Sequence, residues 1–339
     1  MPIKIFKEEY LTAKEGICLY HPEYTTSNVH ESIDVVYFPF MVHEGILKDE
    51  LFDKMNAKVP KECVDPRARF EYMNKILPLH LINLYQEKLK RQRRTLHRKP
   101  LVFFHISDFS ESYGLDSNII ILRVCANRST ISDNDIIMPF YVPYSKWGGP
   151  QKKIKPSLGF CGCPFTHPSR LKAINEIHSS QSIEFNKMFT KVFFHHIQSV
   201  IDKQNPHLQQ EERNALSESK KSEMAEHFKQ ILSDNIFSFC PRGRGNTSIR
   251  FYETLREGRI PVMIDSDQVL PYEDRIDWSD IVICAKDVNE LIQTIHDWTN
   301  KRDLIALQKR CREIWENYLT KEKFFEILPN YIERYLSER

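Results

Sequence analysis

Hydrophobic and polar positions follow two patterns that alternate along the chain. Short runs of β-branched and aromatic residues predict strands, and stretches with apolar residues at helical spacing predict helices. In the first half these patterns predict strands at residues 33–39, 101–106, 119–124 and 136–138, and a helix at 67–94. This alternation is typical of an α/β protein with parallel sheets.

The second half repeats the alternation after a stretch rich in Pro, Gly and Lys at 143–156, which predicts a linker. A polar stretch at 202–222 predicts a loop and the start of an exposed helix. A compact unit follows, with a strand at 236–240, a helix at 247–257 and a strand at 260–264, and amphipathic helices fill 287–335. We therefore predict an N-terminal domain at 1–145, a linker at 146–156, a second domain at 157–312, and a C-terminal helix at 313–339 that could return to the N-terminal domain.

The charge balance of the chain argues against a protein whose main role is to coat nucleic acid. The chain has 48 Lys and Arg against 46 Asp and Glu, a formal net charge of +2, and a protein that coats nucleic acid is usually far more basic. A basic run at 88–99 is interpreted as the solvated end of a helix, because no aromatic residues interleave with its charges. A non-catalytic protein that binds an anionic polymer through this run and the linker lysines stays as an alternative.

Cysteine usage and hydropathy predict a cytoplasmic protein without a membrane span. The 8 cysteines are scattered and often lie in apolar runs, which suits reduced thiols better than a disulfide framework. Cys161 and Cys163 have no matching second pair, so we predict no zinc site. The longest apolar stretch, residues 35–42, is too short to cross a bilayer.

Glycine is scarce and unevenly placed, which directs attention to one region. The chain has only 10 glycines, and those at 148, 149, 159, 162, 243, 245 and 258 fall within one interval. Gly243 and Gly245 lie between a predicted strand and a predicted helix, where free backbone N–H groups and the helix dipole favour an anion. The sequence therefore predicts an anion-binding loop here, with Asn246 or Thr247 as the helix cap.

Charged side chains around this loop suit a nucleoside diphosphate. Arg242, Arg244 and Arg250 offer bidentate donors to phosphate oxygens, and Glu253 follows Arg250 on the same helix face. A carboxylate there can accept both hydroxyls of a ribose. The alternative is that Arg250 and Glu253 form a surface ion pair of little energetic value.

Two other nucleotide motifs fit less well. The Walker pattern is absent. The dinucleotide fingerprint is approached by Gly243-x-Gly245-x-x-Ser248 with Asp265 after the next strand, but serine replaces the third glycine. An NAD-linked oxidoreductase that uses the unit at 236–265 is therefore a second alternative.

The same residues carry a family resemblance. Cys240-Pro-Arg-Gly, Ser248-x-Arg250-x-x-Glu253 and Gly258-Arg-Ile-Pro-Val-Met-Ile264 closely resemble the signature of the exostosin-like glycosyltransferases. Looser matches in the family's order include Asp34-Val-Val-Tyr-Phe-Pro-Phe40, His105-Ile-Ser-Asp108, and Leu158-Gly-Phe-Cys-Gly162 followed by Arg170. The resemblance spans roughly residues 30 to 300 and is strongest at 240–280.

This resemblance implies a GT-B fold, in which two Rossmann-like domains face a cleft and C-terminal helices pack back across both. It implies an inverting glycosyltransferase that moves a sugar from a UDP-sugar to a hydroxyl of a glycan or polysaccharide, without nucleic acid as a partner. The residues expected to bind the donor are Gly162, Arg170, Arg242, Gly243, Arg244, Gly245, Asn246, Thr247, Ser248, Arg250 and Glu253.

Sugar transfer also needs a base for the acceptor hydroxyl. We predict Asp108, after the strand at 101–106, with His105 behind it; the alternative is that Asp108 only turns the chain. Asp133-Asn-Asp135 and Asp265-Ser-Asp267 both spell the Asp-x-Asp pair that holds a divalent ion in another glycosyltransferase fold. Because the arginines already offer charge to the diphosphate, we expect neither an essential metal nor any other cofactor.

Overall fold

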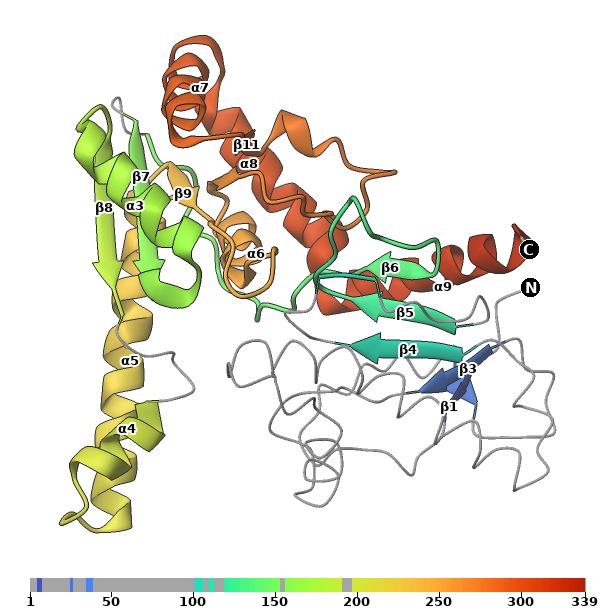
Figure 1. The fold of residues 1–339 in the computed structure, drawn as a ribbon, viewed down its shortest axis with the longest axis horizontal. Helices are drawn as coiled ribbons and strands as arrows, with labels where there is room; N and C mark the ends of the chain where they lie inside the picture. The colour runs from blue at the N-terminus through green and yellow to red at the C-terminus, as the bar shows by residue number, and fades with distance from the viewer. Residues whose placement is uncertain are drawn as a thin grey trace, which may run out of the picture.

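The computed structural model of the chain describes residues 5–7, 25–26, 35–38, 101–105, 110–112, 119–152, 156–190 and 197–338. Three sequence predictions lie outside these residues: the helix at 67–94, the basic run at 88–99, and Asp108. The described residues form two parallel sheets with helices around them (Figure 1).

The first sheet has the strand order β2-β1-β3-β4-β5-β6, and all of its neighbours run parallel. Its strands are β1 (Ile5–Lys7), β2 (Thr25–Thr26), β3 (Val35–Phe38), β4 (Leu101–His105), β5 (Ile119–Arg123) and β6 (Asp135–Ile137). All five residues of β5 are buried, as expected for a strand with neighbours on both sides and cover on both faces. The apolar runs at 101–106, 119–124 and 136–138 therefore predicted real strands.

The second sheet has the order β11-β10-β9-β7-β8 and is also parallel throughout. Its strands are β7 (Ser157–Gly162), β8 (Glu184–Phe189), β9 (Phe237–Phe239), β10 (Ile260–Ile264) and β11 (Ile283–Ala285). The hydrophobic pattern did not predict β8, because this edge strand carries Glu184 and Lys187 and no residue of it is fully buried. Edge strands often carry such charges, which hinder pairing with other chains.

The helices cover the faces of the two sheets and connect their strands. They are α3 (Pro168–Ser180), α4 (Ile197–Gln204), α5 (Gln210–Asp234), α6 (Ile249–Arg256), α7 (Val288–Lys301), α8 (Leu304–Ile314) and α9 (Lys321–Ser337). Short turns of other helix types are η4 (Pro164–Thr166), η6 (Trp278–Asp280) and η7 (Trp315–Leu319). In the part of the chain described here, no helix is both long and apolar enough for a bilayer crossing.

The polar stretch at 202–222 contains the loop and the start of an exposed helix that the sequence predicted. It is helical up to Gln204 and again from Gln210, where a capping box between Gln209 and Glu212 starts α5. The long helix buries few of its residues, Ser217 and Leu232 among them. Its weak apolar stripe is the reason why periodicity did not reveal its length.

Residues 138–152, which follow β6 on the way to β7, pack closely on the second half of the molecule. The side chain of Gln308 in α8 makes two hydrogen bonds to the backbone of Gln151: its Oε1 accepts from the Gln151 N–H at 2.8 Å and its Nε2 donates to the Gln151 carbonyl at 3.0 Å. Gly258, with φ of +58°, lies against the Trp147 ring, so close that a Cβ would meet the ring at 2.7 Å. The connection is therefore a packed strap.

Helix α9 returns to the first sheet, where Figure 1 shows it beside β5 and β6. Tyr335 Oη donates to Asn134 Oδ1 at 3.2 Å, and both residues are buried. Phe324 and Ile332 of this helix share one hydrophobic core with Leu122 of β5. The C-terminal helix thus packs across both halves of the molecule.

Loops from the carboxyl edges of the two sheets meet each other. Asn127, after β5, forms an antiparallel bridge with Gln268, after β10. The backbone N–H of Val269 donates to Ala126 at 3.2 Å, and that of Arg128 donates to Asp267 at 2.7 Å. The α/β class with two parallel sheets, predicted from the sequence, is confirmed.

Candidate functional site

The strand order of the second sheet has a topological switch point between the carboxyl ends of β7 and β9. These strands are neighbours, but the chain continues from β7 to β8 on one side and from β9 to β10 on the other. In open α/β sheets, ligands bind in the crevice at such a switch point. Gly162 ends β7, and the loop 241–248 follows β9. The predicted donor-binding residues therefore lie where this architecture binds ligands.

Arg170 of α3 binds the start of the loop 241–248 through hydrogen bonds from its guanidinium to backbone carbonyls. Its Nε donates to the Arg242 carbonyl at 2.7 Å and its Nη2 to the Pro241 carbonyl at 2.7 Å. Its Nη1 donates to the backbone carbonyl of Cys163 at 3.1 Å. A Cβ on Gly243 would lie 3.5 Å from Arg170 Nη2, which is ordinary van der Waals contact. Arg170, expected as a donor ligand, is thus committed to the backbone of the loop.

Arg250 reaches from the first turn of α6 to the end of β7. Its guanidinium stacks on Phe228 of α5, with 4.5 Å between Cζ and the ring centroid, and lies 5.7 Å from the Phe160 ring centroid. Within the described residues, its buried Nη1 has no hydrogen-bond partner. A half-buried cation with an unpaired donor, held between aromatic rings, is a preorganised anion site.

Glu253 lies one turn further along α6 and is half-buried near Arg250. Burial raises the pKa of the Glu253 carboxyl, and the charge of Arg250 opposes that rise. Both charges also act on the pKa of the Cys161 thiol in β7, which burial raises, so they lie near this strand. No hydrogen bond or ion pair joins Arg250 to Glu253 among the described residues, so the surface ion pair considered as an alternative is not formed.

The start of α6 differs from its prediction. The helix is capped at Ser248, one or two residues after the predicted cap, and the Ser248 side chain makes no capping hydrogen bond. Thr247 Oγ1 instead donates to Asn246 Oδ1 at 3.5 Å. The prediction was wrong because the side chain of Asn246 is drawn into the contact between the two halves, where its Nδ2 donates to the Ala126 carbonyl at 2.6 Å.

The remaining loop residues differ in their accessibility. Arg242 is half-buried, and its Nη2 donates to the Arg244 carbonyl at 3.3 Å. Arg244 is exposed, and Gly245 is buried. The structure thus brings together all of the predicted donor-binding residues around one crevice, but gives Arg170 and Asn246 roles within the protein.

The predicted acceptor side is described only in part. The backbone of His105 ends β4 and pairs with Arg123 of β5. Ser110, two residues after Asp108, accepts a hydrogen bond through its Oγ from the Asn246 N–H at 3.3 Å. The segment that follows β4 therefore touches the loop 241–248, and the roles of His105 and Asp108 stay predictions.

Both Asp-x-Asp sequences take part in the fold itself. Asp135 forms a buried ion pair with Arg123 at 3.5 Å, and burial raises its pKa against the attraction of that arginine. Asp267 accepts hydrogen bonds from the hydroxyl and the N–H of Ser129, which lower its pKa. Within the described residues, no group of three His, Cys, Asp or Glu side chains could hold a metal ion. The expectation about metal stays a prediction.

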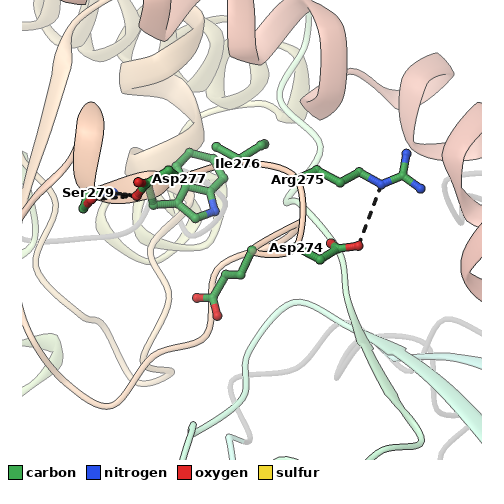
Figure 2. Close-up of a pocket in the computed structure, with 7 residues that line it drawn as sticks. Asp274, Arg275, Ile276, Asp277 and Ser279 are labelled. Carbon is green, nitrogen blue, oxygen red and sulfur yellow. Dashed lines mark hydrogen bonds and ion pairs between the residues drawn. The ribbon is translucent and has the colours of Figure 1, made fainter.

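A separate open pocket of about 500 Å³ is lined by residues 273–279 (Figure 2). Figure 2 shows two of its acidic side chains engaged with neighbours: Asp274 pairs with Arg275 and Asp277 accepts from Ser279. Tyr331 of α9 also donates to Asp274. None of the predicted donor-binding residues lines this pocket, so it is separate from the candidate site at the ends of β7 and β9.

Comparison with known proteins locates the similarity in the same part of the chain. Residues 184–297, which contain the loop 241–248 and α6, match the family model of the Exostosin GT47 domain. The resemblance to exostosin-like glycosyltransferases is confirmed. The exostosin-like segment, residues 184–297, includes Arg250 and Glu253 but not Gly162 or Arg170.

Two relatives show how far the similarity extends. An Exostosin-1 homolog of Caenorhabditis elegans is 29% identical over 114 residues, which cover 33% of this chain and 29% of the relative. Exostosin-1 of Drosophila melanogaster is 31% identical over 118 residues, 31% of this chain and 15% of the relative. The chain thus matches less than a third of the length of either relative.

The solved structures that match this chain have low sequence identity and low TM-scores. A mutant of S. aureus TarM in complex with fondaparinux, alpha-GlcNAc-glycerol and UDP has 11% identity and a TM-score of 0.39, over 73% of this chain and 53% of that chain. The spinosyn rhamnosyltransferase SpnG complexed with thymidine diphosphate has 12% identity and a TM-score of 0.33, over 80% of this chain and 84% of that chain.

Sequence reasoning missed the two aromatic rings that contact the Arg250 guanidinium. Phe228 is 22 residues before Arg250 in a stretch that looked like exposed helix, and Phe160 lies in another strand. No local spacing connects these residues with Arg250. The scarce Gly162 was the one available signal, because it marks a place where a side chain approaches the backbone.

Proposed function

We propose that this protein is a glycosyltransferase that moves a sugar from a UDP-sugar to a hydroxyl of a glycan or polysaccharide. One observation carries the proposal. Arg250 and Glu253 stand side by side at the switch-point crevice, inside the exostosin-like segment, and neither uses the other as an ion-pair partner among the described residues. An unpaired cation and a buried carboxylate one turn apart suit a diphosphate and a ribose.

Arg250 would stabilise the diphosphate as it leaves. Its stacking on Phe228 fixes the guanidinium before the ligand arrives, and its buried Nη1 has no hydrogen-bond partner among the described residues. Donors that are already oriented toward developing charge need no reorganisation during the reaction, and removing one such donor typically costs about 100-fold or more in rate. The exposed start of α6 adds its backbone N–H groups on the same side.

Glu253 would bind the ribose of the nucleotide. Its carboxyl is buried, which raises its pKa and disfavours the charged form while the site holds no ligand. Two hydroxyls that donate to the carboxylate would favour the charged form again. A bound ribose would therefore supply the hydrogen-bond donors that stabilise the ionised Glu253 carboxylate.

The transfer itself would be a single displacement that inverts the anomeric carbon. A new bond forms between the acceptor oxygen and the anomeric carbon while the bond from that carbon to the diphosphate oxygen breaks. The acceptor proton passes to a base, for which we propose Asp108 with His105 behind it, and UDP leaves with the bonding electrons. The contact of Ser110 with Asn246 supports this assignment, because it brings the segment after β4 to the loop 241–248.

The two alternatives are less well supported. An NAD-linked oxidoreductase would need a third glycine where Ser248 caps α6, and the segment matches a glycosyltransferase family model. A polymer-binding protein would use the basic run at 88–99, which lies outside the described residues. Neither alternative explains why Arg250 and Glu253 lie together, half-buried, with Arg250 against Gly162.

Thermal unfolding with candidate ligands separates the three functions. UDP should raise the unfolding temperature of the wild-type protein, whereas NAD and heparin should not. Arg250→Ala and Glu253→Ala should abolish the UDP shift. Lys172→Ala, whose side chain on α3 is 78% exposed, is the matched loss of a positive charge and should keep the shift. A shift with NAD alone, or with heparin alone, would overturn the proposal.

A further inference from the structure

The amide nitrogen and the amide oxygen of the Asn246 side chain both have hydrogen-bond partners within the protein. The residue is 4% exposed. Its Nδ2 donates to the Ala126 carbonyl at 2.6 Å and to Asn127 Oδ1 at 2.8 Å, so both amide hydrogens have partners. Its Oδ1 accepts from Thr247 Oγ1 at 3.5 Å. An amide bonded in this way has no donor left for a nucleotide.

The backbone of the same residue reaches two further segments. Its N–H donates to Ser110 Oγ at 3.3 Å, and its carbonyl accepts from Ser266 Oγ at 3.3 Å. Asn127, in turn, donates through Nδ2 to Glu111 Oε1 at 2.6 Å. Asn246 therefore joins the loop 241–248 to the loop after β5, to the segment that follows β4, and to the loop after β10.

These contacts link the two sides of the proposed reaction. The loop 241–248 precedes Arg250 directly, and Ser110 follows the segment in which we place the base. Asn246 is the described residue of the loop 241–248 whose side chain donates hydrogen bonds into the first half of the molecule. The Asn246 amide is therefore one of the contacts that would set the distance between the donor and the base, beside the backbone hydrogen bonds of Val269 to Ala126 and of Arg128 to Asp267.

We infer that Asn246 is a positioning residue, which sets the spacing between the donor-binding loop and the acceptor side without touching the nucleotide. This inference rests on the proposed glycosyltransferase function and changes the role that the sequence suggested for Asn246. A reacting pair that is misplaced by 1 Å can lose about 100-fold in rate. Loss of the amide should therefore lower turnover while donor affinity is kept.

The test separates affinity from turnover for three variants. Asn246→Ala removes the amide, Asn127→Ala removes one of its partners from the other side of the contact, and Arg250→Ala removes a proposed donor ligand. Asn214→Ala, on the exposed face of α5, is the matched control. The dissociation constant of UDP is measured by calorimetry. The turnover number for release of UDP from UDP-sugars is measured at saturating donor.

Asn246→Ala should keep the dissociation constant of UDP within about twofold and lower the turnover number at least about tenfold. Asn127→Ala should act in the same direction, and the double variant should lose less than the product of the two single losses, because both remove one contact. Arg250→Ala should instead weaken UDP binding, and Asn214→Ala should change neither quantity.

Each other outcome decides against the inference in a recognisable way. If Asn246→Ala weakens UDP binding as strongly as Arg250→Ala, Asn246 is a donor ligand. If it changes neither affinity nor turnover, or if the losses of the two asparagine variants multiply fully, the contact does not position the reacting groups. If the wild-type protein binds no UDP, the proposed function itself fails, and this inference fails with it.

Discussion

Gly162 and Arg250 meet at the end of β7, where a Cβ on Gly162 would lie 3.4 Å from Arg250 Nη2. The glycine also has a φ of +151°, a conformation that other residues rarely adopt. Space for the guanidinium and an unusual backbone conformation thus coincide at one position. The proposed diphosphate site depends on this coincidence.

Gly162→Ala should therefore weaken UDP binding about tenfold, because the added methyl group displaces the Arg250 guanidinium, and should destabilise the fold by about 1 kcal/mol through backbone strain. Calorimetric titration with UDP and urea unfolding measure the two effects. Gly148→Ala is the control, since a Cβ there meets nothing within 4 Å. Unchanged UDP affinity in Gly162→Ala would show that Arg250 does not need this space.

Phe228→Leu should weaken UDP binding about threefold to tenfold. The leucine fills part of the same volume but does not attract the guanidinium, a contact worth about 0.5 to 2 kcal/mol. Trp298→Leu removes a similar contact, with Arg302 at 4.3 Å from the ring centroid, on α7 and outside the proposed site. If both variants weaken UDP binding equally, the effect comes from general destabilisation and not from the orientation of Arg250.

Raising the pH should strengthen the binding of UDP-glucose to the wild-type protein. Burial raises the pKa of Glu253 above its ordinary value of 4.5, and ribose hydroxyls that donate to the carboxylate favour its ionised form. Affinity should therefore increase as the pH rises through the raised pKa and then level off. UDP-glucose is the probe because its diphosphate is a diester without a titration near neutral pH.

Glu253→Gln should remove this pH dependence of UDP-glucose binding. The same variant reports on the free protein, where the sign is opposite. A raised pKa contributes stability that is present below the unfolded-state pKa and lost as the pH rises through the folded-state pKa. Urea unfolding should show wild-type protein losing stability relative to Glu253→Gln above pH 4.5. Parallel pH profiles of the two proteins would contradict a titrating Glu253.

Arg259→Ala should cost about 3 kcal/mol of folding free energy, far more than the loss of an exposed ion pair. Arg259 is buried, its guanidinium donates to the carbonyls of Leu232 and Gly149 at 3.1 Å, and burial lowers its pKa to about 10. Removal leaves several buried acceptors without donors. Arg128→Ala, which breaks a pair with the half-buried Glu273, should cost at most about 1 kcal/mol. Equal losses in urea unfolding would mean that the strap at 138–152 is not held by Arg259.

The sequence predicted the parts of the molecule that depend on local patterns. Strands β5 and β10 are continuous apolar runs, and Gly258 follows α6 with φ of +58°, as a helix-ending glycine should. The unit from β9 to β10 was therefore found almost residue by residue. Arg250 and Glu253 were found for the same reason, because helical spacing places them on one face.

Features that depend on distant partners could not be predicted in this way. Arg170 is 72 residues from the carbonyl of Arg242 that it binds, and Asn246 is 120 residues from Ala126. Their polar side chains look like ligands in the sequence, because nothing local shows that the backbone of another segment uses their donors. Edge strand β8 was missed because its charged residues interrupt the apolar pattern.

Release of UDP from a panel of UDP-sugars, with and without glycan acceptors, tests the central claim most directly. The account predicts that wild-type protein and Lys172→Ala turn over at least one UDP-sugar, and that Arg250→Ala is slower by about 100-fold. Absence of turnover with every UDP-sugar, together with no binding of UDP by the wild-type protein, would contradict a glycosyltransferase.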